Sequence, residues 1–410
     1  HISLFTYLFL LIFPHTTTLR EISFWTAAIC WVLLRLQKSE PFIPLNPITI
    51  SLSLFMAIAF LALIVGIDPL ENLKQFKGEL LVPFLLFLMA ATQFGNIEKI
   101  KRLLFVFLVS LAIYTSLTII ESTTYGLRYY WSPPPGVEYR GNMGGALIFP
   151  MILGVFLLIK NRWLKYSLIP FTILEFILLT TYGSFTMFLG IVSVFPLWVL
   201  FAKPKKYRLW MLAFITIFIF IFGLLFYTYK DNPVINKYRI RFEKIINISG
   251  ELKSESGFTD RIALWKAAVD ILKDRPLLGY GWGIEKFKKL THQEKFGEQW
   301  KIKKPYVYDL FFKRNEFPLP HNIFVDIAIQ SGLVGAASFL SFLLIYIFHI
   351  IRIGTHNDSD TDHNFLIIIV GGVILIFMIT NLLNSELCRT SGKIFFVILG
   401  VGAAWMNNRG

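Results

Sequence analysis

A histidine and an arginine in this sequence are of types that could transfer a proton and bind a phosphate group. His321 opens the apolar stretch 321–340, HNIFVDIAIQSGLVGAASFL, and follows Pro318 and Pro320. Histidine can hold or release a proton near neutral pH because its unperturbed pKa is about 6.5. Arg261 lies upstream in a polar segment, and its planar guanidinium can bind phosphate oxygens through paired hydrogen bonds. Together they would suit acid–base chemistry on a phosphate-bearing ligand.

Each of these residues also has a plainer interpretation. Arg261 could pair with Asp260 or with a lipid head group, and His321 could be a polar anchor at the membrane boundary. A third cation, Arg140, lies in the stretch Glu138-Tyr-Arg-Gly next to an apolar segment, and its plain interpretation is also a membrane anchor. The elements that position these side chains therefore decide between the interpretations.

The composition is that of an all-α polytopic membrane protein. The chain has 410 residues, of which 55% are hydrophobic and 16% charged, and its mean hydropathy is +0.61. A soluble domain would carry about 25% charged residues. Apolar blocks alternate with charged connections, which predicts about 12 transmembrane helices. The expected spans lie near 2–14, 21–36, 49–67, 79–93, 102–121, 142–159, 163–180, 184–202, 209–229, 321–351, 364–383 and 394–408.

The distribution of basic residues predicts the orientation and the domains. Alternate connections hold about twice as many lysines and arginines as the others, so we expect them to be cytoplasmic. The long polar loop 230–320 then lies outside. We predict a transmembrane bundle of about nine spans over 1–229, a helical periplasmic domain over 230–320, and about three further spans over 321–410.

The long loop is basic and contains a predicted helix. Residues 230–320 hold 19 lysines and arginines against 12 acids, a balance that suits anionic partners such as pyrophosphate or membrane lipids. Residues 259–272 predict a helix with Thr259 or Asp260 as its N-cap. Ile262, Trp265, Val269 and Leu272 recur on one side as an apolar stripe. We expect such an amphipathic helix to lie along the outer face of the membrane.

The cysteine and acid patterns predict neither a metal nor a cofactor. Cys30 and Cys388 have no partner spacing typical of zinc or of a disulfide framework. The run Asp358-Ser-Asp-Thr-Asp362 lacks the glycine and the distal glutamate of a calcium loop. No acidic motif suited to magnesium lies on the predicted outer side. We expect lipid-linked partners and no nucleic acid.

Three motifs in one order carry a resemblance to a known family. They are Arg261-Ile-Ala-Leu-Trp265, the glycine-rich Pro276-Leu-Leu-Gly-Tyr-Gly-Trp-Gly283, and His321-Asn322-Ile-Phe followed by Gln330-Ser-Gly-Leu-Val-Gly335. In order, spacing and position within a large late external loop, they resemble the O-antigen ligase and O-antigen polymerase superfamily.

The resemblance implies a glycosyltransferase of the bacterial inner membrane with its active site on the periplasmic face. A ligase of this kind moves a glycan from undecaprenyl pyrophosphate to a sugar hydroxyl of the lipid A-core during lipopolysaccharide biosynthesis, without a metal. His321 would be the base that activates the acceptor hydroxyl, Arg261 would bind the donor pyrophosphate, and Asn322 would contact substrate.

The sequence departs from the family at one place and leaves alternatives open. Many members carry Ser-Arg-Gly near the end of the corresponding middle span, where this chain has residues 180–185, TTYGSF, without arginine. Arg140 is our candidate for the missing cation. A polymerase of the same superfamily is the nearest alternative, and an oligosaccharyltransferase acting on protein comes after it. A lipid-oligosaccharide flippase is less favoured because the two halves of the chain are not alike.

Overall fold

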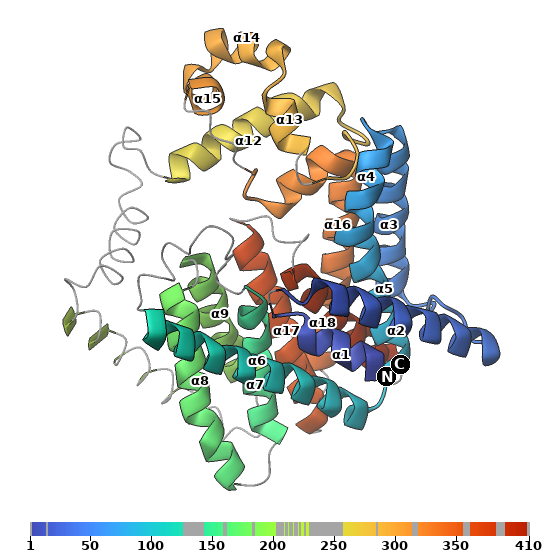
Figure 1. Ribbon diagram of the computed structural model, residues 1–410, viewed down its shortest axis with the longest axis vertical. Coiled ribbons are helices and arrows are strands. Elements are labelled where there is room, and N and C mark those ends of the chain that lie inside the picture. Colours follow the sequence, from blue (N-terminus) through green and yellow to red (C-terminus); the bar gives the residue numbers. More distant parts are fainter. Residues whose placement is uncertain are drawn as a thin grey trace.

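The computed structural model is built of helices throughout the part of the chain that it describes (Figure 1). It describes residues 2–13, 15–125, 143–158, 162–182, 185–201, single positions between 209 and 228, 257–283, 286–313, 319–355, 361–382 and 390–407. The predicted all-α polytopic membrane fold is confirmed.

The bundle consists of helices from both ends of the chain. The amino-terminal half has α1 (Ile2–Leu10), α2 (Thr17–Gln37), α3 (Pro47–Val65), α4 (Pro69–Phe76), the π-helical turn η1 (Lys77–Leu81), α5 (Val82–Gln93), α6 (Ile97–Tyr125), α7 (Met143–Leu158), α8 (Arg162–Tyr182) and α9 (Phe185–Phe201). The carboxy-terminal part adds α17 (Thr361–Asn381) and α18 (Thr390–Asn407). The long α16 (Ile323–Thr355) joins the bundle to a small helical domain formed by residues 257–313, which we call the outer domain.

Five helical stretches in the described residues are long and apolar enough to cross a bilayer. They are Pro47–Val65, Pro69–Gln93, Ile97–Leu117, Ile323–Ile353 and Asn364–Asn381. Shorter apolar helices cover Ala146–Val155 and Met187–Pro196. The predicted number of about 12 spans is not confirmed. Within the bundle, α18 packs against α5, α17 against α7 and α9, and α16 against α3.

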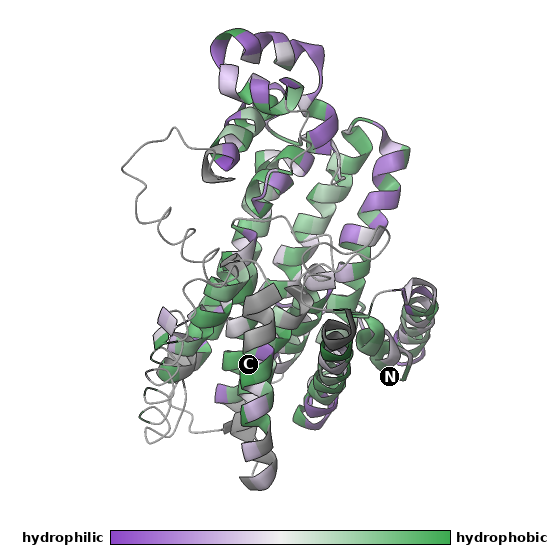
Figure 2. Cartoon of the chain, turned by 60° about the vertical axis from the view of Figure 1, so that its left-hand side comes forward, coloured by the Kyte–Doolittle hydropathy of each residue, from purple (hydrophilic) through white to green (hydrophobic). Residues whose placement is uncertain are grey.

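A small helical domain lies above the bundle in Figure 1. It contains α12 (Gly257–Asp274), α13 (Lys286–Thr291), α14 (Glu294–Lys303), α15 (Pro305–Tyr308) and the π-helical turn η3 (Asp309–Lys313). Figure 2 shows hydrophilic residues gathered on this domain and apolar residues on the helices below it. Its buried core is aromatic and includes Ile329 from the first turns of α16.

One buried carboxylate ties the helices of this domain together. The Trp300 indole donates to Asp270 at 3.0 Å, and the Lys304 amine donates to the same oxygen at 2.5 Å. Burial acts to raise the pKa of Asp270, but the hydrogen bonds from Lys304 and Trp300 outweigh it and hold the pKa below its ordinary value. Because the folded state lowers this pKa, the stabilisation is present at neutral pH and is lost as the pH falls through the lowered value.

The long helix α16 is broken near its outer end. Ser331 has a φ of −126° and Gly332 has a φ of +70° with a ψ of −177°, a conformation open essentially to glycine alone. A Cβ at position 332 would also overlap the carbonyl group of Leu277. The first two turns of α16 therefore contribute to both cores, with Ile329 in that of the outer domain and Ile327 in that of the bundle, while the helix as a whole packs against α3.

The segment 276–283, which we call the glycine loop, fills this break. Tyr280 N donates to Ile329 O and Gly281 N donates to Gln330 O, each at 2.9 Å. In the other direction, Leu333 N donates to the carbonyl of residue 276 at 2.7 Å. The loop thus satisfies backbone groups that the break leaves without helical partners.

The other side of the glycine loop rests on the turn between α3 and α4. Ile67 N donates to Tyr280 O at 2.9 Å, and the approach is close enough that a Cβ on Gly66 would lie 2.6 Å from the Gly281 Cα. The buried Lys286 amine donates to Ile67 O at 2.6 Å. Burial lowers the pKa of Lys286, and the charge of Asp68 partly offsets that effect. The loop therefore joins three elements: α12, α16 and the α3–α4 turn.

Gly332→Ala is expected to loosen the outer domain from α16. The methyl group meets the Leu277 carbonyl and the backbone conformation is strained, so we expect destabilisation of roughly 3 kcal/mol. The measurement is the thermal unfolding midpoint together with protease sensitivity of the glycine loop. Gly78→Ala is the matched control, because a Cβ at Gly78 meets nothing within 4 Å. If Gly332→Ala and Gly78→Ala had the same unfolding midpoint and the same protease sensitivity, the break at Gly332 would not be what fixes the glycine loop on α16.

Candidate functional site

His321 lies where the chain enters α16 and has an unusual backbone conformation. Its φ is +51°, in the left-handed region, and its side chain is half-buried. Histidine visits this region more often than most residues, but the conformation still costs about 1–3 kcal/mol and persists only where the surrounding structure imposes it. Strain of this kind is concentrated at functional sites, which keeps His321 as the leading catalytic candidate.

Asn322 supplies part of the constraint by capping α16. Its Oδ1 accepts hydrogen bonds from Phe324 N at 2.9 Å and from Val325 N at 3.2 Å. Its Nδ2 donates to Leu382 O at 3.1 Å, just beyond the end of α17. The side-chain amide is thus engaged at both ends, so a structural role accounts for Asn322. Its predicted contact with substrate stays a prediction.

Trp265 joins α12 to the turn that carries His321. The indole Nε1 donates to Pro320 O at 3.0 Å, immediately before the histidine. Arg261 is one helical turn before Trp265, so the two side chains project from the same side of α12. This geometry brings the two candidates of the sequence analysis, Arg261 and His321, to the same junction between the outer domain and the bundle. The Arg261 side chain is half-buried there.

The predicted helix exists, but its start differs from the expectation. α12 begins at Gly257, so Thr259 and Asp260 lie inside its first turn and are not its N-cap. Asp260 instead accepts a hydrogen bond from the Tyr306 hydroxyl of α15 at 2.5 Å. That contact holds the start of α12, next to Arg261, against the rest of the domain. The predicted end is confirmed, since α12 stops at Asp274.

The predicted apolar stripe of α12 is not the side that packs into the domain core. The buried apolar side chains are Ala263, Leu264, Ala267, Ala268 and Ile271. The predicted stripe contains no buried member: Val269 is exposed and the others are half-buried. The small alanines form the core-facing side because they let α12 approach its neighbours closely. Ile262 and Val269 of the predicted stripe lie on the opposite side.

Two acids near the junction were missed by the sequence analysis. Asp326 is buried in the first turn of α16, and Gln330 hydrogen-bonds its carboxyl group. Gln330 also accepts a hydrogen bond from Gly283 N at 2.8 Å. On η1, Glu79 accepts a hydrogen bond from the Trp282 indole at 2.9 Å. The sequence did contain a signal for Asp326, because an acid in the first turn of an apolar helix is costly to bury unless it has a partner.

Other parts of the predicted site lie outside the described residues. Arg140 and residues 183 and 184 of the TTYGSF stretch lie outside the described residues. In the part of the chain that the structure describes, no three histidine, cysteine or acidic residues lie together in a way that could hold a metal ion. Arg261 and His321 are two predicted site residues that the described structure brings to one junction.

Comparison with known proteins bears directly on this junction. Residues 170–340 match the family described as O-Antigen ligase, a region that contains Arg261, His321 and Asn322 and that excludes Arg140. A Rickettsia felis protein named "Putative polysaccharide ligase" is 24% identical over 319 residues, covering 76% of this chain and 70% of the relative. A Rickettsia conorii protein with a corresponding name is 25% identical over 339 residues, covering 80% of this chain and 74% of the relative.

These similarities confirm the predicted resemblance to the O-antigen ligase and polymerase superfamily. They support a ligase-type, glycan-transferring function for a multi-pass membrane protein. The identity of the donor, the acceptor and the catalytic residues is a separate matter.

Substitutions at Asn322 should separate capping from substrate contact. Asn322→Ala removes the acceptor of the Phe324 and Val325 amides and is expected to cost about 1 kcal/mol at the start of α16. Hydrogen exchange at these two amides should then accelerate about fivefold. Asn322→Asp keeps an acceptor at the helix N-terminus, so exchange there should remain close to the original rate. Unchanged exchange in Asn322→Ala would contradict the capping role.

Proposed function

Starting from the O-antigen ligase region that residues 170–340 match, we propose that the protein is an O-antigen ligase. It transfers a glycan from undecaprenyl pyrophosphate to a sugar hydroxyl of lipid A-core at the periplasmic face of the bacterial inner membrane. The observation that carries the proposal is the hydrogen bond from Trp265 to Pro320, because it joins the helix of Arg261 to the turn of His321.

His321 is the general base of the proposed reaction. Its imidazole takes the proton from the acceptor hydroxyl as the oxygen attacks the anomeric carbon of the donor glycan. Such a base contributes about 10²–10⁴-fold to a rate, provided that it is held within hydrogen-bonding reach of the hydroxyl. The fixed backbone around His321, between the Trp265–Pro320 contact and the Asn322 cap, supports this role.

Arg261 binds the donor pyrophosphate and stabilises it as the bond to the sugar breaks. The leaving group gains negative charge in that step, and a fixed guanidinium stabilises developing charge without reorganisation. Its planar fork matches two phosphate oxygens at once. The basic balance of the 230–320 loop supports an anionic substrate on this side. Arg140 and Asn322 are proposed as further substrate contacts.

The proposed step requires neither a metal nor another cofactor. Arginine charge takes over the neutralising role that a divalent ion has in other transfers from phosphate donors. The junction at the outer end of α16 is next to the bilayer, so two lipid-anchored substrates can reach it by diffusing in the plane of the membrane. This arrangement suits lipid A-core as the acceptor.

The catalytic pair is tested by substitution in purified protein with lipid-pyrophosphate glycan and lipid A-core. His321→Ala should lower kcat by at least about 100-fold, the contribution of a general base. His349→Ala, at the far end of the same helix, is the control and should retain activity. Normal turnover by His321→Ala with intact folding would remove the mechanism.

Arg261 substitutions test the bidentate contact with the donor. Arg261→Ala should lower kcat/KM for the donor by about 100-fold, and Arg261→Lys should recover only part of this loss because lysine lacks the fork. Lys301→Ala, an exposed cation on α14, serves as the control. If Arg261→Lys restored the full kcat/KM for the donor, the bidentate contact would be contradicted, because a positive charge alone would be sufficient.

The choice of acceptor separates the ligase from a polymerase of the same superfamily. With one donor preparation, lipid A-core and a second lipid-linked glycan are offered separately, and the ligase proposal expects elongation of lipid A-core alone. Exclusive elongation of the lipid-linked glycan would assign a polymerase. The same reactions run with a chelator should keep their rate, whereas loss of activity that added metal restores would contradict the metal-independent step.

A further inference from the structure

The side of α12 that faces away from the domain core carries apolar side chains next to two exposed lysines, Lys266 and Lys273. Ile262 and Val269 lie on this side, opposite the buried alanines, and Trp265 lies at its edge, where it packs partly against the domain core. Val269 has 53% of its surface exposed. An exposed apolar stripe of this kind on a helix normally marks an interaction surface.

The contacts of Trp265 show which way this side points. Its indole reaches Pro320 O, directly before α16 enters the bundle. The apolar side of α12 therefore faces the outer ends of the membrane helices rather than bulk solvent above the domain. Figure 1 shows α12 lying across the top of the bundle, below α14.

Leu277 connects this side to the lipid-facing surface of α16. It follows the end of α12, and its side chain is 66% exposed. Its carbonyl accepts from Val334 N at 3.4 Å, and Leu333 and Val334 are themselves exposed at the top of the membrane-spanning part of α16. Further exposed apolar residues continue along the same helix at Leu340, Leu344, Phe348 and Ile351. Leu277 thus adjoins the exposed apolar stripe of α16, a helix that is long and apolar enough to cross a bilayer.

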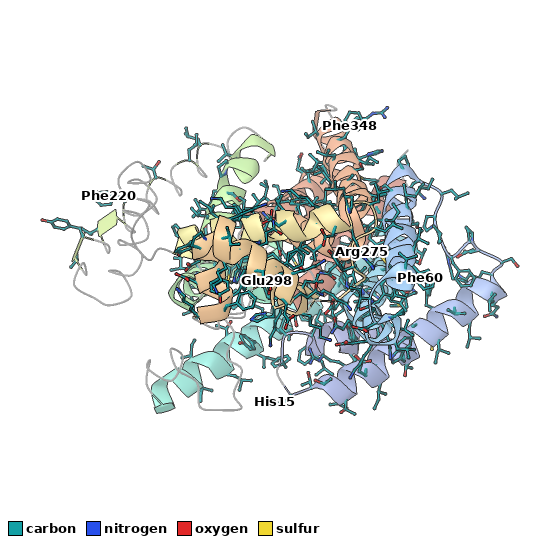
Figure 3. All side chains as sticks on the ribbon, turned by 90° about the horizontal axis from the view of Figure 1, so that it is seen from above. His15, Phe60, Phe220, Arg275, Glu298 and Phe348 are labelled. Atoms are coloured by element: carbon teal, nitrogen blue, oxygen red, sulfur yellow. The ribbon has the colours of Figure 1, made fainter. Side chains whose placement is uncertain are left out.

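Cations border the apolar residues. Lys266, Lys273 and Arg275 are exposed on or just after α12, and Lys273 also forms an ion pair with Asp270 at 3.3 Å. Arg275 lies 5.4 Å from the centre of the Tyr280 ring, which orders its guanidinium, and Figure 3 labels it near the end of α12 that approaches α3 and α4. An apolar stripe flanked by lysine and arginine matches the boundary between acyl chains and anionic head groups.

We propose that Ile262, Val269 and Leu277, bordered by Lys266, Lys273 and Arg275, form a docking surface for the phospholipids of the outer leaflet. The apolar side chains enter the acyl boundary and the cations pair with lipid phosphates. The surface holds α12 at head-group depth and so fixes the height of its first turn, which carries Arg261. This inference concerns binding to bulk phospholipid and stands independently of the transfer reaction.

The test measures the depth of labels in reconstituted vesicles of phosphatidylcholine and phosphatidylglycerol. Cys30 and Cys388 are replaced by serine, and a fluorophore is attached to Val269→Cys or Leu277→Cys. Quenching by lipids with doxyl groups near the head group should exceed that of Ile302→Cys at least threefold. Ile302 is the matched control, because it is an apolar side chain on α14 with 82% of its surface exposed. Leu340→Cys is the positive control within the span.

Equal, weak quenching at positions 269, 277 and 302 would overturn the proposal, provided that position 340 is strongly quenched. The electrostatic part is tested by changing Lys266, Lys273 and Arg275 to glutamine. Quenching at position 269 should then lose its dependence on the phosphatidylglycerol fraction. A dependence that survives the triple substitution would show that these cations do not contact the head groups.

Discussion

The structure depends on one constraint: the break in α16 at Ser331 and Gly332 must have its backbone groups satisfied near the membrane boundary. An unpaired amide or carbonyl there costs several kcal/mol, because little water is available to replace the lost partner. The glycine loop meets this need by pairing with both sides of the break. It can approach so closely only because glycines occupy the tightest points.

The positions of the candidate catalytic groups follow from this contact. The glycine loop continues directly from α12, so fixing the loop on α16 also fixes the end of that helix. Trp265 then reaches Pro320, and Arg261 follows one turn earlier on the same side. The strained backbone of His321 is held between this contact and the Asn322 cap. In our proposal, this rigid junction holds the positive charge of Arg261 in place, and that charge takes the role that a metal ion has in other phosphate-dependent transfers.

Sequence patterns predicted the local features of this arrangement and missed those that depend on distant contacts. The existence of the helix predicted over 259–272, its end before Pro276 and the apolar entry after His321 follow from local residue types, whereas the start of that helix at Gly257 does not. The core-facing side of α12 could not be predicted in this way, because three of its buried residues are alanines, which contribute little to a hydrophobic pattern. The break at Gly332 was also missed. A glycine inside an apolar helix is ordinary in membranes, and only the partner loop reveals its conformation.

The most direct test of the account is the distance between α12 and the membrane-spanning part of α16 in lipid nanodiscs. Spin labels at Lys266 and Leu344, both exposed positions, report it by pulsed dipolar spectroscopy. If the glycine loop fixes the outer domain on α16, the distribution should contain one narrow distance, unchanged when donor lipid is added. A broad or two-peaked distribution would contradict a junction that holds Arg261 and His321 in one arrangement.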